Sequence, residues 1–134
     1  MEWQRLPSRD RGGMKMMAEM SPQAFVSQLH AVVVEESTAT YRDLLCHTRA
    51  EQASDPYWKR VLTLFSELTP EQREVLLELT RQVATDATAN VLGVIDGACV
   101  ESDAPARFRL THGGRDLAGD LQSLFLEQAE QSSP

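Results

Sequence analysis

The chain has 134 residues, of which 42% are hydrophobic and 25% are charged, and its formal net charge is −7. This length and composition favour one folded domain and exclude a chain that is disordered throughout. Because an acidic domain repels phosphate backbones, nucleic acid is excluded as the expected partner. A protein partner with a basic surface is expected instead.

No apolar run approaches the roughly 18–20 residues that cross a bilayer, and the N-terminus lacks the apolar stretch of a secretory signal. We therefore expect no membrane association and a cytoplasmic location. The two cysteines, Cys46 and Cys99, fit no metal-binding spacing. We expect both to be reduced, with Cys46 buried as a small hydrophobic residue on a helix face.

Residues 1–20 combine mixed charges, a Gly12-Gly13 pair and no hydrophobic period, which predicts a disordered N-terminal tail. Four basic and three acidic residues give this tail a charge of +1, so residues 21–134 carry −8. A methionine-rich patch that binds a membrane or a partner is the alternative interpretation. Its members are Met14, Met16, Met17 and Met20.

Three helix starts share one signature, a capping residue followed by proline, at Ser21-Pro22, Asp55-Pro56 and Thr69-Pro70. The first helix is expected to reach about Cys46, and a polar interval at Glu35–Thr38 either continues it or kinks it. Apolar spacing in the second helix predicts an inward face. That face contains Tyr57, Trp58, Val61, Leu62, Phe65 and Leu68.

The third helix is expected to run from Pro70 to Asp96, with Gln72 completing a capping box and Gly97 ending it. At 1.5 Å per residue it would be about 40 Å long. Gly93 marks either a close approach to another helix or an early end. The apolar positions expected to face inward are Leu76, Leu79, Val83, Ala87, Val91, Val94 and Ile95.

The C-terminal part predicts a short hairpin or extended loop over Cys99–Leu110, a turn at Gly113-Gly114 and a last helix capped by Asp116. The stripe of that helix contains Leu117, Leu121, Leu124 and Phe125. Residues 131–134 are expected to fray. The fold prediction is all-α: one helical domain over residues 21–130, roughly a four-helix bundle with the hairpin or loop before the last helix.

The sequence carries no catalytic or metal-binding motif, so we expect no catalytic residues, no metal and no cofactor. Asp86 and Asn90 form a polar pair among apolar residues of the third helix. If their face is buried, Asp86 needs a hydrogen-bond network, for which Arg60, Arg81 or Tyr41 could supply donors. A carboxylate that contacts a ligand is the other interpretation.

Three further residues are candidates for ligand or partner binding. Asp96, next to Gly97, is interpreted first as a helix cap and second as a functional carboxylate. Tyr57 and Trp58 are interpreted as core residues because of their helical spacing, and alternatively as interface residues, where aromatic side chains are enriched.

Several short motifs resemble a group of small bacterial helical proteins without assigned function, over most of residues 21–130. The motifs are Asp55–Lys59, Leu68–Arg73, Asp86 to Gly97 and Leu117–Glu127. More loosely, the chain resembles the small acidic helical immunity proteins that neutralise bacterial toxins. The second resemblance implies binding to a basic protein, and neither implies a catalytic residue.

The leading hypothesis is therefore a non-enzymatic, acidic protein-interaction module that binds a basic protein, and an immunity-like protein is one form of it. The alternative is a small-molecule-binding or enzymatic helical domain with a pocket near Asp86 and Asn90. A homodimer formed through a remaining apolar face, such as Leu124–Leu126, is a third hypothesis.

Overall fold

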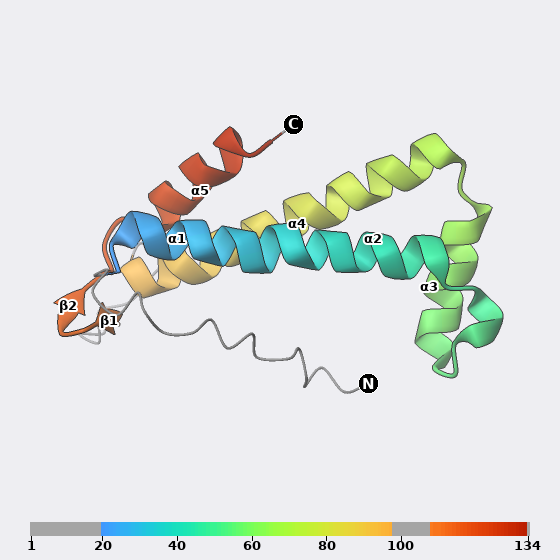
Figure 1. Cartoon of the computed structure of the whole chain (residues 1–134), viewed down its shortest axis with the longest axis horizontal. Coiled ribbons are helices and arrows are strands. Elements are labelled where there is room, and N and C mark those ends of the chain that lie inside the picture. The colour runs from blue at the N-terminus through green and yellow to red at the C-terminus, as the bar shows by residue number, and fades with distance from the viewer. Residues whose placement is uncertain (1–19, 98–107, 134) are drawn as a thin grey trace, which may run out of the picture.

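A computed structural model describes residues 20–97 and 108–133, and in these ranges the chain is mostly helical (Figure 1). The predicted all-α class is confirmed. The elements are α1 (Pro22–His30), the π-helical segment η1 (Ala31–Glu36), α2 (Ser37–His47), the 3₁₀ turn η2 (Ala50–Gln52), α3 (Pro56–Glu67), α4 (Pro70–Asp96), β1 (Thr111–His112), β2 (Arg115–Asp116) and α5 (Leu121–Gln131).

The three predicted helix starts are confirmed, each with a side-chain cap. Ser21 Oγ accepts from the Ala24 amide at 3.0 Å, and Asp55 Oδ1 accepts from the Tyr57 amide at 2.7 Å. At the start of α4, Thr69 and Gln72 form the reciprocal capping box. The end of α4 is also as predicted, because Gly97 takes the left-handed conformation with φ 82°.

Two long helical rods form the frame of the molecule. Segments α1, η1 and α2 form one rod without a break, and α4 runs back along it in the opposite direction (Figure 1). The shorter helices α3 and α5 pack at opposite ends of this pair. Of the two predicted alternatives, the structure therefore shows the continuous helix, and the polar interval begins in the π-helical turn of η1 and continues into α2.

The hydrophobic core has two parts, one at each end of the rods. At the α5 end, its buried residues are Val26, Val34, Ala89, Leu92, Leu121 and Phe125. At the α3 end, they are Leu45, Leu62, Phe65 and Leu77. The middle of the long pair lies between the two clusters, and neither short helix covers it completely.

The predicted inward face of α4 is wrong. Leu79, Val83 and Val91 are 57–59% exposed, and Ala87 and Val94 are exposed too, whereas Leu76 and Ile95 are partly buried. The residues that α4 buries are Leu77, Thr85, Ala89, Leu92 and Gly93. The reason is that α4 carries aliphatic residues on both sides, and its helical neighbours pack against only one of them.

Other burial predictions also need correction. Tyr57 is 60% exposed and Cys46 is exposed, while Trp58 is half-buried against Tyr41. Because α3 crosses the end of the long pair, only Leu62 and Phe65 of its residues are fully buried. Cys46 is exposed because it lies about 100° around α2 from Leu45, the residue that α2 buries.

The segment before α5 differs from the prediction. A two-stranded antiparallel sheet pairs Thr111 with Asp116 and His112 with Arg115, around the predicted Gly113-Gly114 turn. Asp116 does not cap the last helix, because its carboxylate accepts from the Ala118 amide and α5 begins only at Leu121. The hairpin expected over Cys99–Leu110 lies mostly outside the described residues, as do Cys99 and residues 1–19.

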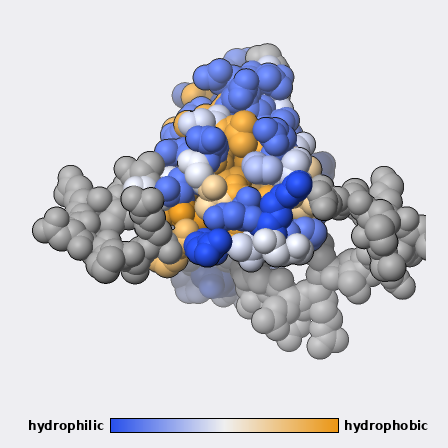
Figure 2. Space-filling model, turned by 90° about the vertical axis from the view of Figure 1, so that its left-hand side faces the viewer, coloured by the Kyte–Doolittle hydropathy of each residue, from blue (hydrophilic) through white to orange (hydrophobic). Residues whose placement is uncertain are grey.

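The end of the molecule that carries this sheet retains a shallow apolar groove. Viewed from this end, apolar surface lies between hydrophilic side chains (Figure 2). The groove has a volume of about 380 Å³. Its apolar lining consists of Met20, Phe25, Leu29, Val32, Leu110 and Leu117.

Candidate functional site

The first candidate site is the outer face of α4, which we define as Val75, Leu79, Val83, Ala87 and Val91 together with Asp86 and Asn90. The aliphatic members recur at every fourth residue, so they form one continuous ridge along the helix. All of them are exposed. Contiguous exposed apolar surface of this kind is typical of an interaction site.

Asp86 and Asn90 lie on this face and are exposed. The predicted buried network of Asp86 is wrong: among the described residues, its carboxylate accepts one hydrogen bond, from Gln82 Nε2 at 2.9 Å, one turn back on the same helix. Arg60, Arg81 and Tyr41 play no part in it. The prediction that Asp86 is buried failed because it took the wrong face of α4 as the inward face.

No cation of α4 neutralises its outer face. The two arginines of the helix are both directed towards other elements: Arg73 donates to the carbonyls of Phe65 and Ser66, and Arg81 pairs with Glu35. Within the described ranges, neither Glu71 nor Asp86 has an ion pair. The outer face of α4 is therefore an apolar ridge with acidic groups nearby.

The second candidate site is built by the π-helical turn. His30 and Glu35 are five residues apart, so in an α-helix their side chains would point about 140° away from each other. In the wider π turn, residues five apart lie on one side, and the His30 Nδ1 to Glu35 Oε1 distance is 3.8 Å. Single π turns inside α-helices are frequent at functional sites.

Arg81 of α4 connects the two rods at this point. Its Nη2 atom lies 2.5 Å from Glu35 Oε1, and its side chain is 23% exposed. The hydrogen bond from Arg81 lowers the pKa of Glu35, and the bond to Glu35 raises the pKa of Arg81. Both groups are therefore charged near neutral pH, and each offsets the other.

His30 is nearly inaccessible, with an exposed fraction of 3%. Its ring lies 5.7 Å from the ring of Phe125 on α5, centroid to centroid. Burial lowers its pKa below 6.5, an effect that Glu35 opposes and Arg81 reinforces. The imidazole is therefore neutral near pH 7, and its buried Nε2 atom has no hydrogen-bond partner among the described residues.

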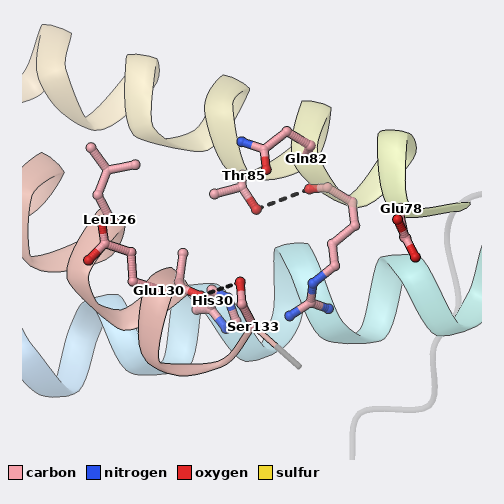
Figure 3. Close-up of a pocket in the computed structure, with 9 residues that line it drawn as sticks. His30, Glu78, Gln82, Thr85, Leu126, Glu130 and Ser133 are labelled. Carbon is pink, nitrogen blue, oxygen red and sulfur yellow. Dashed lines mark hydrogen bonds between the residues drawn. The ribbon is translucent and has the colours of Figure 1, made fainter. Parts of the chain in front are cut away.

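These groups border a notch between α1, α4 and the C-terminal part of α5 (Figure 3). Its volume is about 490 Å³. Figure 3 shows the side chains of Glu130 and Glu78 at opposite ends of the group of residues that line the notch. We define the central notch by its lining residues: His30, Glu78, Arg81, Gln82, Thr85, Leu126, Ala129, Glu130 and Ser133.

The hydroxyl groups in the lining of the central notch donate to the backbone. Thr85 donates to the carbonyl of Arg81, and Ser133, just after α5, donates to the carbonyl of Ala129, so neither hydroxyl is hydrogen-bonded to a base in this structure. In the part of the chain that the structure describes, no three His, Cys, Asp or Glu side chains could hold a metal ion.

Asp96 has a structural position. Its carboxylate accepts from the amides of Gly119, Leu121 and Gln122, at 2.8 to 3.2 Å. It is thus a cap, but it caps α5 from the end of α4 rather than its own helix. Tyr57 and Trp58 lie at the α3 end of the molecule, far along the rods from this contact.

The sequence-predicted residues are therefore not brought together: Asp86 and Asn90 share one face, while Asp96, Tyr57 and Trp58 lie elsewhere. Sequence reasoning missed His30, Glu35 and Arg81. One signal was present, since His30 interrupts an apolar series of every fourth residue between Val26 and Val34. The π turn that brings Glu35 beside it left no such signal.

Comparison with known proteins identifies no relative: no family model, no curated protein and no solved structure matches this chain. Within residues 20–97 and 108–133, no helix combines the length and apolar character of a membrane span.

Proposed function

We propose that this protein is a non-enzymatic interaction module that binds a basic protein partner along the outer face of α4. The observation that carries the proposal is the uncovered aliphatic ridge of that face. Leu79 and Val83 are each more than half exposed in the middle of the longest helix, where a soluble helix usually presents polar residues.

The geometry of the ridge indicates the kind of partner. Rows of every fourth residue on one helix pack into the grooves of another, so an amphipathic helix is the best fit. The aliphatic residues from Val75 to Val91 span 16 residues, or about 24 Å of helix at 1.5 Å each. Because each four-residue step turns about 40° beyond a full turn, the ridge winds around α4, and a partner helix that crosses it would contact mainly the central members Leu79, Val83 and Ala87.

Charge favours a basic partner over a second copy of this chain. The chain carries −7, and among the described residues Glu71 and Asp86 of α4 have no ion pair, whereas Glu74 pairs with Arg42. Two copies would bring like charges together, whereas lysine or arginine residues flanking the partner's apolar stripe would be attracted. Such attraction accelerates association and weakens as salt is added.

One specific form of such a module is an antagonist of a basic toxin. The resemblance to small acidic immunity proteins supports this form, and so does the absence of a reaction centre among the described residues. A gene for a toxin beside the gene for this chain would strengthen the proposal, since antagonists and their targets are needed together.

The test compares the outer face of α4 with an equally exposed apolar position elsewhere. The full chain and the double variant Leu79→Ser/Val83→Ser are used as bait in extracts of the source organism, and recovered proteins are quantified at low and high salt. The matched control is Leu64→Ser, because Leu64 on α3 is 55% exposed. Binding to the purified partner is then measured by calorimetry.

The proposal expects a basic protein that the wild type and Leu64→Ser recover, that the double variant loses by at least about tenfold, and that high salt releases. If no recovered protein depends on Leu79 and Val83, the proposal is wrong. If light scattering shows a dimer that the double variant abolishes, the occupant of the face is a second copy and the basic partner is excluded.

A further inference from the structure

Helix α5 belongs to one half of the hydrophobic core. It packs against α1 and α4, whereas α3 lies at the opposite end of the rods (Figure 1). We name the two halves the α5-end cluster (Val26, Val34, Ala89, Leu92, Leu121 and Phe125) and the α3-end cluster (Leu45, Leu62, Phe65 and Leu77). The two clusters share no member, so α5 can separate from the rods while the α3-end cluster stays packed.

The two ends of α5 are attached in different ways. Its first turn is held by Asp96, whose carboxylate accepts from three backbone amides there. Its later turns cover His30, whose ring lies 5.7 Å from the ring of Phe125. Figure 3 shows the imidazole of His30 beside Ser133, at the C-terminal end of α5. An opening that starts at this end therefore brings water to His30.

In the closed arrangement, His30 has no means of satisfying a second proton. The residue is 3% exposed, and its buried Nε2 atom has no hydrogen-bond partner among the described residues. Both nitrogens of an imidazolium carry protons, so Nε2 would become a donor with neither an acceptor nor water. An unpaired charged donor in a protein interior costs more free energy than a neutral one.

The charges around the imidazole do not remove this cost. The groups that face it are Glu35 of η1, Glu78 and Arg81 of α4, and Glu130 of α5. Glu35 attracts an imidazolium from 3.8 Å, but it already pairs with Arg81, whose positive charge repels the imidazolium. Glu78 and Glu130 are exposed, so water screens their charges. Burial therefore outweighs these charges and lowers the pKa of His30 below 6.5.

We propose that α5 is a pH-sensitive element: protonation of His30 releases the C-terminal half of α5 from α1 and α4, while the α3-end cluster stays folded. The released state exposes Phe125 and the residues of the α5-end cluster that it covers. Because the open state accepts the proton and the closed state excludes it, acidification favours opening by up to about tenfold for each pH unit below pH 6.5.

Native-state hydrogen exchange of the full chain distinguishes this local opening from global unfolding. Protection factors, corrected for the intrinsic exchange rate at each pH, are measured by NMR at pH 7.5 and 5.5 over a series of low urea concentrations. The amides of Leu62 and Phe65 supply the urea dependence of the opening that exposes the α3-end cluster. A local opening exposes less surface, so its urea dependence is smaller.

The amides of α5 from Phe125 onwards should lose about tenfold in protection between pH 7.5 and 5.5, with a smaller urea dependence than Leu62 and Phe65 show. His30→Phe and His30→Gln should each remove this pH dependence, because neither new side chain titrates in this range. His47→Gln is the matched control and should retain it, since the side chain of His47 is 74% exposed.

Three results would overturn the proposal. The first is exchange of the α5 amides that does not change with pH, and the second is a pH dependence that persists in both His30 variants. The third is pH-dependent exchange with the same urea dependence as Leu62 and Phe65, because the opening would then be global. The urea series uses the wild type, so it decides the question even where a variant does not fold. No step depends on a partner bound to the outer face of α4.

Discussion

The two faces of α4 have similar chemistry and opposite environments. The inner face buries Leu77, Ala89 and Leu92 against the first rod, α3 and α5. The outer face presents Leu79, Val83 and Val91 at comparable spacing and leaves more than half of each exposed. Aliphatic residues alone therefore do not identify the core side of a helix.

What separates the two faces is the number of neighbouring elements. The described ranges contain only the two rods and the short helices α3 and α5, which lie at opposite ends, so no described element covers the second side of α4. The inner side also accepts polar residues, since Arg81 and Thr85 lie between Leu77 and Ala89 in the middle of the rods. In the middle of α4, the inner face thus carries the charged Arg81, while the outer face carries the aliphatic Leu79 and Val83.

The largest expected difference between the faces is in stability. Leu77→Ala should lower the free energy of unfolding by about 2–5 kcal/mol. The side chain of Leu77 is 1% exposed, so its truncation leaves a cavity in the core. Leu79→Ala should change it by less than about 0.5 kcal/mol, because its side chain is already largely solvated. Urea denaturation measures both. Equal losses would show that the outer face of α4 is covered.

A smaller effect is expected where α4 ends. Asp96→Ala should cost about 1–2 kcal/mol and increase amide exchange at the start of α5, because three amides lose their acceptor. Asp120 is the matched control: it occupies the cap position of α5 but makes no capping hydrogen bond. If Asp120→Ala destabilised α5 as much as Asp96→Ala does, the cap assigned to Asp96 would be wrong.

The buried polar centre of the inner face should make stability depend on pH. Since burial lowers the pKa of His30 below 6.5, the unfolded chain binds a proton more readily than the folded chain just below that pH. Stability is therefore complete above about pH 6.5 and falls as the pH decreases towards the folded-state pKa, by at most about 1.4 kcal/mol per pH unit.

Denaturation between pH 5 and 7.5 measures this slope. His30→Phe should reduce it, while His47→Gln, which alters an imidazole whose side chain is 74% exposed, should retain it. A slope that persists unchanged in His30→Phe would contradict the assignment. The contribution of Glu35 lies in a lower window, because its pKa is lowered from 4.5 and its stabilisation is lost only as the pH falls below that value.

The smallest effect concerns the two ion pairs that join the rods. Arg42→Gln should produce no measurable change, because both Arg42 and Glu74 are well exposed to solvent. Arg81→Gln should lower stability by under about 1 kcal/mol, since Arg81 is less exposed and lies on the inner face of α4. A larger loss in Arg42→Gln than in Arg81→Gln would reverse the ranking.

Local signals made the helices predictable. Caps at Ser21, Asp55 and Thr69 and the stop at Gly97 depend on residues within one turn of each boundary, so a sequence contains them directly. The last helix was placed too early, because its cap comes from Asp96, more than 20 residues away in the chain. A cap of this kind has no local pattern.

The candidate sites depended on tertiary structure and were less predictable. Asp86 and Asn90 were recognised as a pair, but their environment followed from the wrong inward face. The contact of His30 with Glu35 requires the π turn, and Arg81 reaches Glu35 from 46 residues away in the chain. Neither of these two contacts leaves a periodic signal in the sequence.

The most direct test of the exposed outer face of α4 is the reactivity of single cysteines. In a background of Cys46→Ser and Cys99→Ser, Val83→Cys and Ala89→Cys are compared for their rates of modification by a thiol reagent. The structure predicts rapid modification at position 83 and strong protection at position 89, where Ala89 is 3% exposed. Protection of position 83 in the isolated monomer would contradict the central claim, whereas its protection only in the presence of a basic partner would support the proposed interface.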